Sequence, residues 1–225
     1  MTGTVPMALA ESLQSSLYCA HPALWLFLVR SLANGHPVAQ SDIAGALSIP
    51  LAEVQDALAA FSDIEYDASG DIVSCGLSLL PSPHCLKING HDLFTWCALD
   101  TLMYPVALNQ TAQVSSRCPV TDGVISLEVS PRGISRLTPT GASVSMVVPD
   151  TQLGCCNVRG SFCSRVHFLS SPKAAATWIS RHPEAIMVSV EDAWQLGAAI
   201  ARRRLSEASI VAAGKPVQFF PKHFS

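Results

Sequence analysis

Two cysteines and an aspartate stand in two short motifs whose residue types could form one reactive site. Cys97 and Asp100 lie in the run Trp-Cys-Ala-Leu-Asp-Thr-Leu (96–102), and Cys163 lies in Ser-Phe-Cys-Ser-Arg-Val-His-Phe (161–168). Cysteine thiolates are soft ligands that bind soft metals far more strongly than hard ones. A carboxylic acid beside a thiolate-bound metal adds a proton donor. The three residues therefore predict metal–thiolate chemistry assisted by a general acid.

The spacing of apolar residues predicts a helix over residues 92–103. Cys97 and Asp100 are three positions apart, so on this helix they would share one face. Asp100 would then sit among apolar side chains, which raise the pKa of a carboxylic acid and let it keep a proton near neutral pH. Cys163 is distant in the sequence, but we expect it at a loop–strand junction, a common place for functional residues.

Length and composition favour a globular protein with a substantial core. The chain has 225 residues, of which 49% are hydrophobic and 14% charged. Its formal net charge of −3 offers no general attraction to nucleic acid or anionic membranes. The densest apolar run, residues 23–29, is far shorter than the roughly 18–20 residues of a spanning helix. The N-terminus has no basic region typical of a signal peptide. We therefore expect a cytoplasmic protein without membrane or nucleic-acid partners.

Cysteine usage favours reduced thiols over a disulfide framework. The eight cysteines stand at positions 19, 75, 85, 97, 118, 155, 156 and 163, with no secretory signal and no Cys-x-x-Cys motif. The adjacent pair Cys155 and Cys156 falls in a predicted loop over residues 151–161. Two interpretations of this pair stay open: accessory thiols that receive or relay a metal ion, or incidental loop residues.

Residues 1–82 are predicted to form a winged-helix-like structural domain. The signals are helices over 22–33, 41–47 and 50–61, followed by a hairpin over 64–66 and 71–77. The last helix would occupy the position of a DNA-recognition helix, but it carries Glu53, Gln55 and Asp56 and no Lys or Arg. Phosphate contacts need basic side chains, so a structural module is favoured over a DNA reader.

Residues 83–225 are predicted to form a second, mixed α/β domain with a mainly antiparallel sheet, so the fold class is α+β. We expect this domain to hold the candidate site. The predicted strands cover residues 113–117, 124–129, 143–148, 165–169 and 186–190, and further helices cover 174–181 and 191–206.

The two cysteine motifs resemble the active-site motifs of the organomercurial lyases (alkylmercury lyases). Shorter segments carry the resemblance over most of the chain; they are residues 65–67, 114–116, 129–131 and 188–190. The resemblance implies an N-terminal winged-helix-like domain and a C-terminal mixed domain. It also implies that Cys97 and Cys163 bind mercury and that Asp100 is the acid. Position 164 is Ser here, where some relatives carry a second cysteine without an assigned catalytic role.

The activity implied by this resemblance is protonolytic cleavage of a carbon–mercury bond. Two thiolates would hold mercury and load electron density onto it, and Asp100 would protonate the departing carbon. The products would be a hydrocarbon and Hg(II). The resemblance implies no resident cofactor, exogenous thiols for turnover, and a mercuric reductase as the acceptor of Hg(II).

Two other classes of function stay open at this stage. The first is a metal-responsive regulator or mercury-sequestering protein, with the winged helix as DNA reader and the cysteines as sensor. The second is a zinc-binding structural protein that uses Cys97, Asp100 and Cys163 with His167. Zinc sites usually show closely spaced Cys or His pairs, which this chain lacks.

Overall fold

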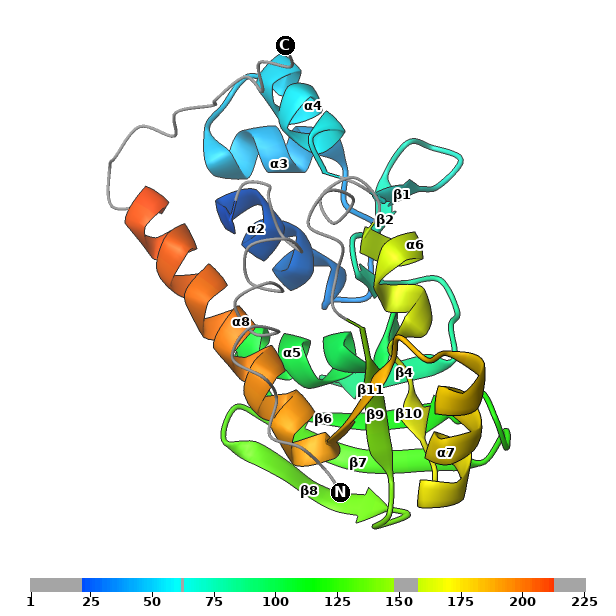
Figure 1. Cartoon of the computed structure of the whole chain (residues 1–225). Coiled ribbons are helices and arrows are strands. Elements are labelled where there is room, and N and C mark those ends of the chain that lie inside the picture. Colours follow the sequence, from blue (N-terminus) through cyan, green and yellow to red (C-terminus); the bar gives the residue numbers. More distant parts are fainter. Residues whose placement is uncertain (1–21, 62, 148–157, 213–225) are drawn as a thin grey trace.

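A computed structural model describes residues 22–61, 63–147 and 158–212 of the chain (Figure 1). The N-terminal helices lie at one end of the molecule, and most strands of a large antiparallel sheet lie at the other (Figure 1). This arrangement confirms the α+β prediction. None of the helices within the described ranges combines the length and the apolar character that a membrane crossing needs.

The N-terminal helices and the hairpin form close to where the sequence predicts them. The helices are α2 (Pro22–Leu32), α3 (Gln40–Leu47) and α4 (Leu51–Ala59), and the hairpin is β1 (Glu65–Tyr66) with β2 (Ile72–Ser74). Helix α2 buries apolar residues at helical spacing, which are Leu24, Trp25, Leu28, Val29 and Leu32. A bridge between Val38 and Ile72 ties the segment before α3 to the hairpin.

The hairpin continues into an eight-stranded sheet in which every pair of neighbours is antiparallel. Its order is β1-β2-β3-β5-β4-β6-β7-β8. The further strands are β3 (Leu77–Ser78), β4 (His84–Ile88), β5 (His91–Thr95), β6 (Ala112–Arg117), β7 (Val124–Ser130) and β8 (Gly133–Thr138). Buried and exposed residues alternate strictly along β6, so one face of the sheet covers the core and the other faces solvent.

A smaller three-stranded antiparallel sheet stands beside the large one. Its order is β10-β9-β11, from β9 (Ser143–Met146), β10 (Phe168–Leu169) and β11 (Ile186–Ser189). Three short or peripheral elements belong to this half of the molecule: α6 (Val158–Ser161), the 3-10 turn η1 (Cys163–Arg165) and α7 (Pro172–Arg181). Helix α7 lies beside the small sheet in Figure 1.

Two helices make the central packing of the molecule. Helix α8 (Val190–Ala212) runs along both α2 and α5 (Ala98–Leu108), as Figure 1 shows. In α5, residues 98–107 are all buried. At the crossing, a Cβ on Gly197 of α8 would lie 3.3 Å from the backbone nitrogen of Met103. Glycine at this position therefore lets the two backbones approach closely.

The predicted helix over residues 92–103 is wrong at both ends. Residues 91–95 form β5, which pairs with β4 from His84↔Thr95 to Ile88↔His91. Helix α5 begins only at Ala98 and continues through Pro105 to Leu108. Because the β4 strand satisfies the backbone of residues 91–95, tertiary pairing overrides the local helical pattern.

The region of the second motif also differs from the prediction. The strand expected over 165–169 is reduced to Phe168–Leu169, because residues 163–165 form a 3-10 turn. In the expected loop over 151–161, residues 158–161 form α6, and the remaining positions lie outside the described residues.

Candidate active site

Cys97 and Asp100 are held together by the start of α5. Cys97 is the N-cap residue, with φ −149° and ψ 171°, and Asp100 is the third residue of the helix. Asp100 Oδ2 accepts a hydrogen bond of 3.2 Å from the Cys97 backbone N–H, and the Asp100 N–H donates to the Cys97 sulfur. This is a capping box, in which each residue satisfies a free N–H of the helix end. The two side chains thus meet through a cap, and not as neighbours on a helix face as predicted.

Backbone contacts fix this junction from both sides. The Thr95 hydroxyl, at the end of β5, donates a 2.9 Å hydrogen bond to the Cys97 carbonyl. The Ala98 N–H, at the start of α5, donates a 3.0 Å hydrogen bond to the Val166 carbonyl. This second bond joins the Cys97 motif directly to the segment that carries Cys163.

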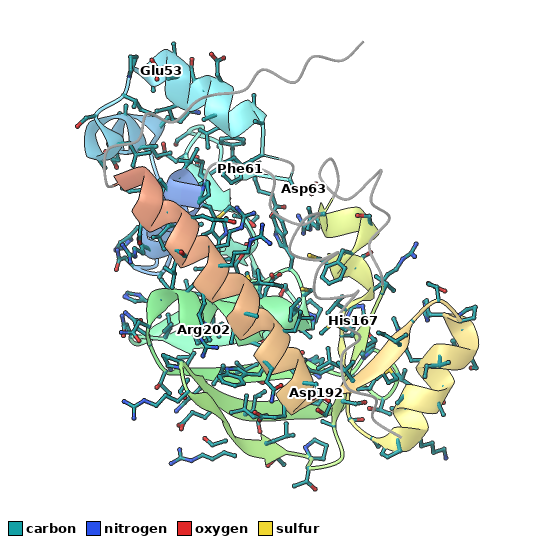
Figure 2. All side chains as sticks on the ribbon, turned by 60° about the vertical axis from the view of Figure 1, so that its left-hand side comes forward. Glu53, Phe61, Asp63, His167, Asp192 and Arg202 are labelled. Carbon is teal, nitrogen blue, oxygen red and sulfur yellow. The ribbon has the colours of Figure 1, made fainter. Side chains whose placement is uncertain are left out.

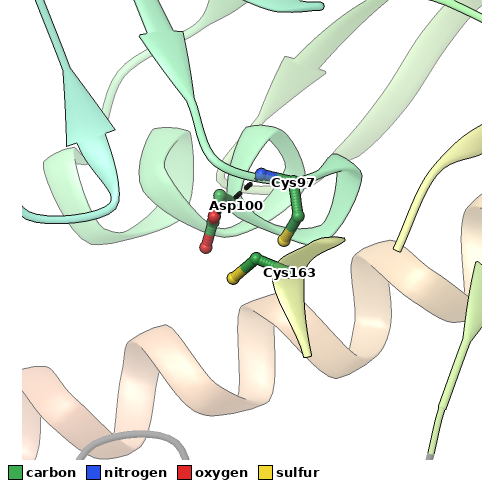
Figure 3. A group of neighbouring side chains, drawn as sticks. All are labelled: Cys97, Asp100 and Cys163. Atoms are coloured by element: carbon green, nitrogen blue, oxygen red, sulfur yellow. Dashed lines mark hydrogen bonds between the residues drawn. The ribbon is translucent and has the colours of Figure 1, made fainter. Parts of the chain in front are cut away.

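Cys163 is the first residue of the turn η1 and faces the α5 cap. In Figure 3 its side chain lies beside those of Cys97 and Asp100. One ligand atom from each of the three residues lies within 4.8 Å of the others. Within the described part of the chain, this is the one group of three or more Cys, His, Asp or Glu side chains that is close enough to hold a metal ion. We call Cys97, Asp100 and Cys163 the metal-capable group.

The three side chains are nearly inaccessible to water. The exposed fraction is 0% for Cys97 and 3% for both Asp100 and Cys163. Phe162 and Leu99, which are adjacent in the chain to Cys163 and Asp100, are also buried. In such surroundings ionic forms are costly unless paired, and electrostatic interactions are stronger than in water.

The protonation of the two thiols follows from this burial. Burial raises the pKa of Cys97 well above that of a free thiol, and the hydrogen bond to Cys163 and the charge of Asp100 raise it further. For Cys163, the hydrogen bond from Cys97 lowers the pKa, but burial and the charges of Asp100 and Asp63 give a net rise. A base is therefore needed to ionise this pair at neutral pH, and Asp100 is the carboxylate within reach.

The start of α5 favours negative charge at this point. Free N–H groups and the helix dipole place partial positive charge at the N-terminus. The Asp100 N–H points at the Cys97 sulfur, and this bond lowers the pKa of that thiol in part. The geometry can thus stabilise a thiolate once the proton has been removed or a metal has replaced it.

The other residues singled out from the sequence lie apart from this cluster or cannot be placed. Cys155 and Cys156, for which accessory thiols and incidental loop residues are the two interpretations, lie outside the described residues. His167 does not belong to the group of Cys97, Asp100 and Cys163, and its Nε2 atom lies 2.9 Å from the Ser164 carbonyl oxygen. Cys75 is a buried thiol whose pKa is raised to about 12 by burial and by the charge of Asp100.

Sequence reasoning missed Arg159, which contacts both the hairpin and the Cys97 motif. Its guanidinium lies over the Trp96 ring and pairs with Glu65. No local pattern marks this residue, because Glu65 is 94 positions away in the chain. The sequence points to this contact only indirectly, because Glu65 and Trp96, the partners of Arg159, lie in segments that resemble one family.

Comparison with known proteins identifies the class to which this fold and site belong. The family model described as alkylmercury lyase matches residues 77–202, and the model described as the helix-turn-helix domain of alkylmercury lyase matches residues 5–76. The chain is 42% identical over 175 residues to an alkylmercury lyase of Staphylococcus epidermidis, covering 77% of this chain and 80% of that protein. It is 39% identical over 203 residues to an alkylmercury lyase of Pseudomonas putida, covering 88% and 93%.

A solved structure agrees with these relatives. The crystal structure of the mercury-bound form of MerB2 matches with a TM-score of 0.75 and 25% identity, over 88% of this chain and 100% of that one. The chain belongs to the alkylmercury lyase family, a family of enzymes that cleave carbon–mercury bonds. This membership confirms the resemblance found from the two cysteine motifs.

Proposed function

We propose that Cys97, Cys163 and Asp100 carry out the protonolytic cleavage of carbon–mercury bonds in this chain. The single observation that carries the proposal is the grouping of two thiols and one carboxyl group within 4.8 Å in a buried site. Thiolates suit a soft metal such as mercury. A buried carboxyl group suits proton transfer to carbon, since water is kept from competing.

The first step exchanges the ligand on mercury. One thiol of the pair attacks mercury in the organomercurial R–Hg–X and forms a sulfur–mercury bond, while X leaves together with the thiol's proton. The mercury–carbon bond is intact at this stage. Asp100, whose carboxylate oxygen lies within 4.8 Å of both sulfur atoms, stays ionised in this step and is the base proposed to take up the proton of the second thiol.

The second step breaks the mercury–carbon bond. The remaining thiol transfers its proton to Asp100 and binds mercury as a thiolate. Electron density from two thiolates weakens the bond to carbon, which then takes the proton from Asp100. The proton of the second thiol thus ends on the hydrocarbon, Asp100 returns to its carboxylate form, and Hg(II) stays on the two sulfur atoms.

We further propose the parts that surround this chemistry. Residues 83–225 would form the catalytic unit and residues 1–82 a structural domain without a nucleic-acid partner. In support, Glu53, Gln55 and Asp56 of α4 are exposed, and α4 contains no Lys or Arg. Small thiols would remove Hg(II) and deliver it to a mercuric reductase in the cytoplasm. No resident cofactor is required by the proposed steps.

The test is hydrocarbon release from phenylmercury or methylmercury in the presence of excess thiol. We expect benzene or methane from the wild type and none above background from Cys163→Ser. The matched control is Cys85→Ser, which removes a free thiol that is not in the metal-capable group. Retention of mercury by the wild type without hydrocarbon would contradict the proposal and favour a sequestering or sensing protein. A gel shift on generic DNA and metal analysis of the purified protein would then test the regulator and zinc alternatives.

A further inference from the structure

Arg159 joins three parts of the molecule that are far apart in the sequence. It lies in α6, and its guanidinium carbon is 5.5 Å from the centre of the Trp96 ring. The same guanidinium pairs with the Glu65 carboxylate on β1. Its backbone N–H donates a 3.1 Å hydrogen bond to Asp63 Oδ2, before β1. Figure 2 labels Asp63, which lies beside α6 in that view.

The partners of Arg159 are themselves held in place. The indole N–H of Trp96 donates a 2.8 Å hydrogen bond to the Ser74 hydroxyl on β2. Burial raises the pKa of Glu65, but hydrogen bonds from Arg159, Ser74 and Trp96 and the charge of Arg159 leave it below its ordinary value. Glu65 is therefore ionised at neutral pH and can hold the guanidinium in one position. We call Glu65, Ser74, Trp96 and Arg159 the hairpin clamp.

The hairpin clamp acts on both thiol-bearing segments. Trp96 directly precedes Cys97, and Arg159 lies four residues before Cys163, in the short helix that leads into η1. The contact between the Arg159 guanidinium and the Trp96 ring therefore connects the two segments on the hairpin side of the site. The Ala98–Val166 hydrogen bond connects them at a second point.

We propose that Arg159 is a positioning residue for the lyase reaction, which holds Cys163 where it can close the pair of thiolates around the substrate's mercury. This inference rests on the proposed function of Cys97 and Cys163. The guanidinium also places a positive charge near Cys163, so the reactivity of that thiol with an alkylating reagent reports whether Arg159 is in position. Residues that orient metal ligands typically change affinity or activity by roughly 10- to 100-fold when removed.

The chain offers a matched control on the other side of Cys163. Arg165 forms an ion pair with Glu184 at 3.4 Å, and its side chain is 48% exposed, against 49% for Arg159. Each arginine is thus half-exposed, paired with a glutamate and close to Cys163 in the chain. Arg165 is the control because it forms its ion pair with Glu184, in the loop before β11, and not with the hairpin.

The experiment compares Arg159→Gln, Arg159→Lys and Arg165→Gln with the wild type. Hydrocarbon release over a range of phenylmercury concentrations gives kcat and KM, and its pH dependence is recorded. Independently, the rate of Cys163 alkylation by iodoacetamide is followed against pH by peptide mass spectrometry. Thermal unfolding shows whether each variant is folded.

We expect Arg159→Gln to lower kcat roughly 10- to 100-fold and to move the midpoint of Cys163 alkylation to higher pH. Arg159→Lys keeps the charge, so its midpoint should stay near that of the wild type, while kcat falls because the planar stacking on Trp96 is lost. Arg165→Gln should match the wild type in both measurements.

Three results would overturn the inference. The first is a wild-type kcat and an unchanged alkylation midpoint in Arg159→Gln. The second is an equal loss in Arg165→Gln. The third is a loss in Arg159→Gln that comes with a lower melting temperature and no shift of either pH profile, which would indicate a purely structural role. If the wild type releases no hydrocarbon, the proposed function fails, and the alkylation profile still tests the effect of Arg159 on Cys163.

Discussion

The two thiols of the candidate site are held by very different structures. Cys97 lies between strand β5, which is paired on both sides within the eight-stranded sheet, and the eleven-residue helix α5. Cys163 lies in a three-residue turn that follows the four-residue helix α6. The first thiol is therefore placed by regular backbone hydrogen bonds. The second has a shorter run of backbone hydrogen bonds around it, to which side-chain contacts such as the Arg159–Glu65 pair are added.

This contrast indicates which part of the site can shift in position at small cost. A residue that caps a buried helix cannot move without breaking the cap hydrogen bonds, so Cys97 and Asp100 form a preorganised pair. A short turn has few hydrogen bonds of its own and can adjust at smaller cost. In the proposed reaction, the Cys97 side would therefore supply a fixed first ligand and the acid. The Cys163 side would supply a ligand whose position depends on other residues.

The largest expected effect is on catalysis. Substitutions of the two cysteines and of Asp100 distinguish mercury binding from proton transfer. Cys97→Ser and Cys163→Ser should each abolish hydrocarbon release. Asp100→Ala should lower it by roughly 10²- to 10⁴-fold, the range of a general acid, while both thiols still bind mercury. Hydrocarbon release and bound mercury are measured on the same samples. Full activity in Asp100→Ala would remove the proposed proton donor.

The next effect is on the pH dependence of the free energy of unfolding. It tests how His84 and His167 pack beside the segment that carries Cys163. Burial lowers the pKa of His84 to about 3, and burial also lowers the pKa of His167, whose ring stacks on that of His84 at 5.8 Å. The unfolded chain binds protons below pH about 6.5, whereas these folded histidines stay neutral until lower pH. The free energy of unfolding should therefore fall as the pH drops below about 6.5, by about 1.4 kcal/mol per pH unit for each histidine that only the unfolded state protonates.

Urea unfolding at a series of pH values measures this slope. His84→Gln should be less stable than the wild type at pH 8, because the ring and its 2.6 Å contact with the Ser116 hydroxyl are lost. It should also show a smaller decrease in stability between pH 6.5 and 4. An unchanged slope in this variant would contradict the assignment of the pH dependence to His84.

A smaller effect is expected from a substitution that presses a new side chain against α5, the helix that Cys97 caps. Gly76 has φ +103°, and a Cβ at this position would lie 2.1 Å from the Tyr104 hydroxyl oxygen on α5. Gly76→Ala should lower the free energy of unfolding by about 1–3 kcal/mol. Gly45→Ala is the control, because it lies within α3 with nothing within 4 Å of its Cβ. That change should raise stability by about 0.5–1 kcal/mol, and equal losses in both variants would argue against the proposed close contact.

The smallest effect is expected at a thiol away from both segments. Cys118 is buried in the β6–β7 connection and is not part of the metal-capable group. Burial raises its pKa, but hydrogen bonds from Thr121 and Ser170 bring it down to about 7. Cys118→Ser keeps a hydrogen-bonding group at this position, so hydrocarbon release should stay close to the wild-type rate. A loss as large as that of Cys163→Ser would place Cys118 in the chemistry.

Local patterns predicted the elements whose residues contact one another within a short stretch. The apolar spacing in α2 and α4 and the turn between β1 and β2 are set by neighbours along the chain, and these elements form near their predicted positions. The helix predicted over 92–103 failed for the opposite reason. Residues 91–95 pair with β4, and periodicity alone does not include the gain from that pairing.

The sequence by itself determined which residues could do the chemistry. The types of Cys97, Asp100 and Cys163, and the motifs around them, were sufficient to indicate a thiolate site with an acid and the family to which the chain belongs. Only the tertiary structure decided how these residues meet: through the cap of α5, across the Ala98–Val166 hydrogen bond, and beside an arginine held by a glutamate 94 positions away. The physical reason is that capping and pairing depend on where the chain turns back on itself, which no local window contains.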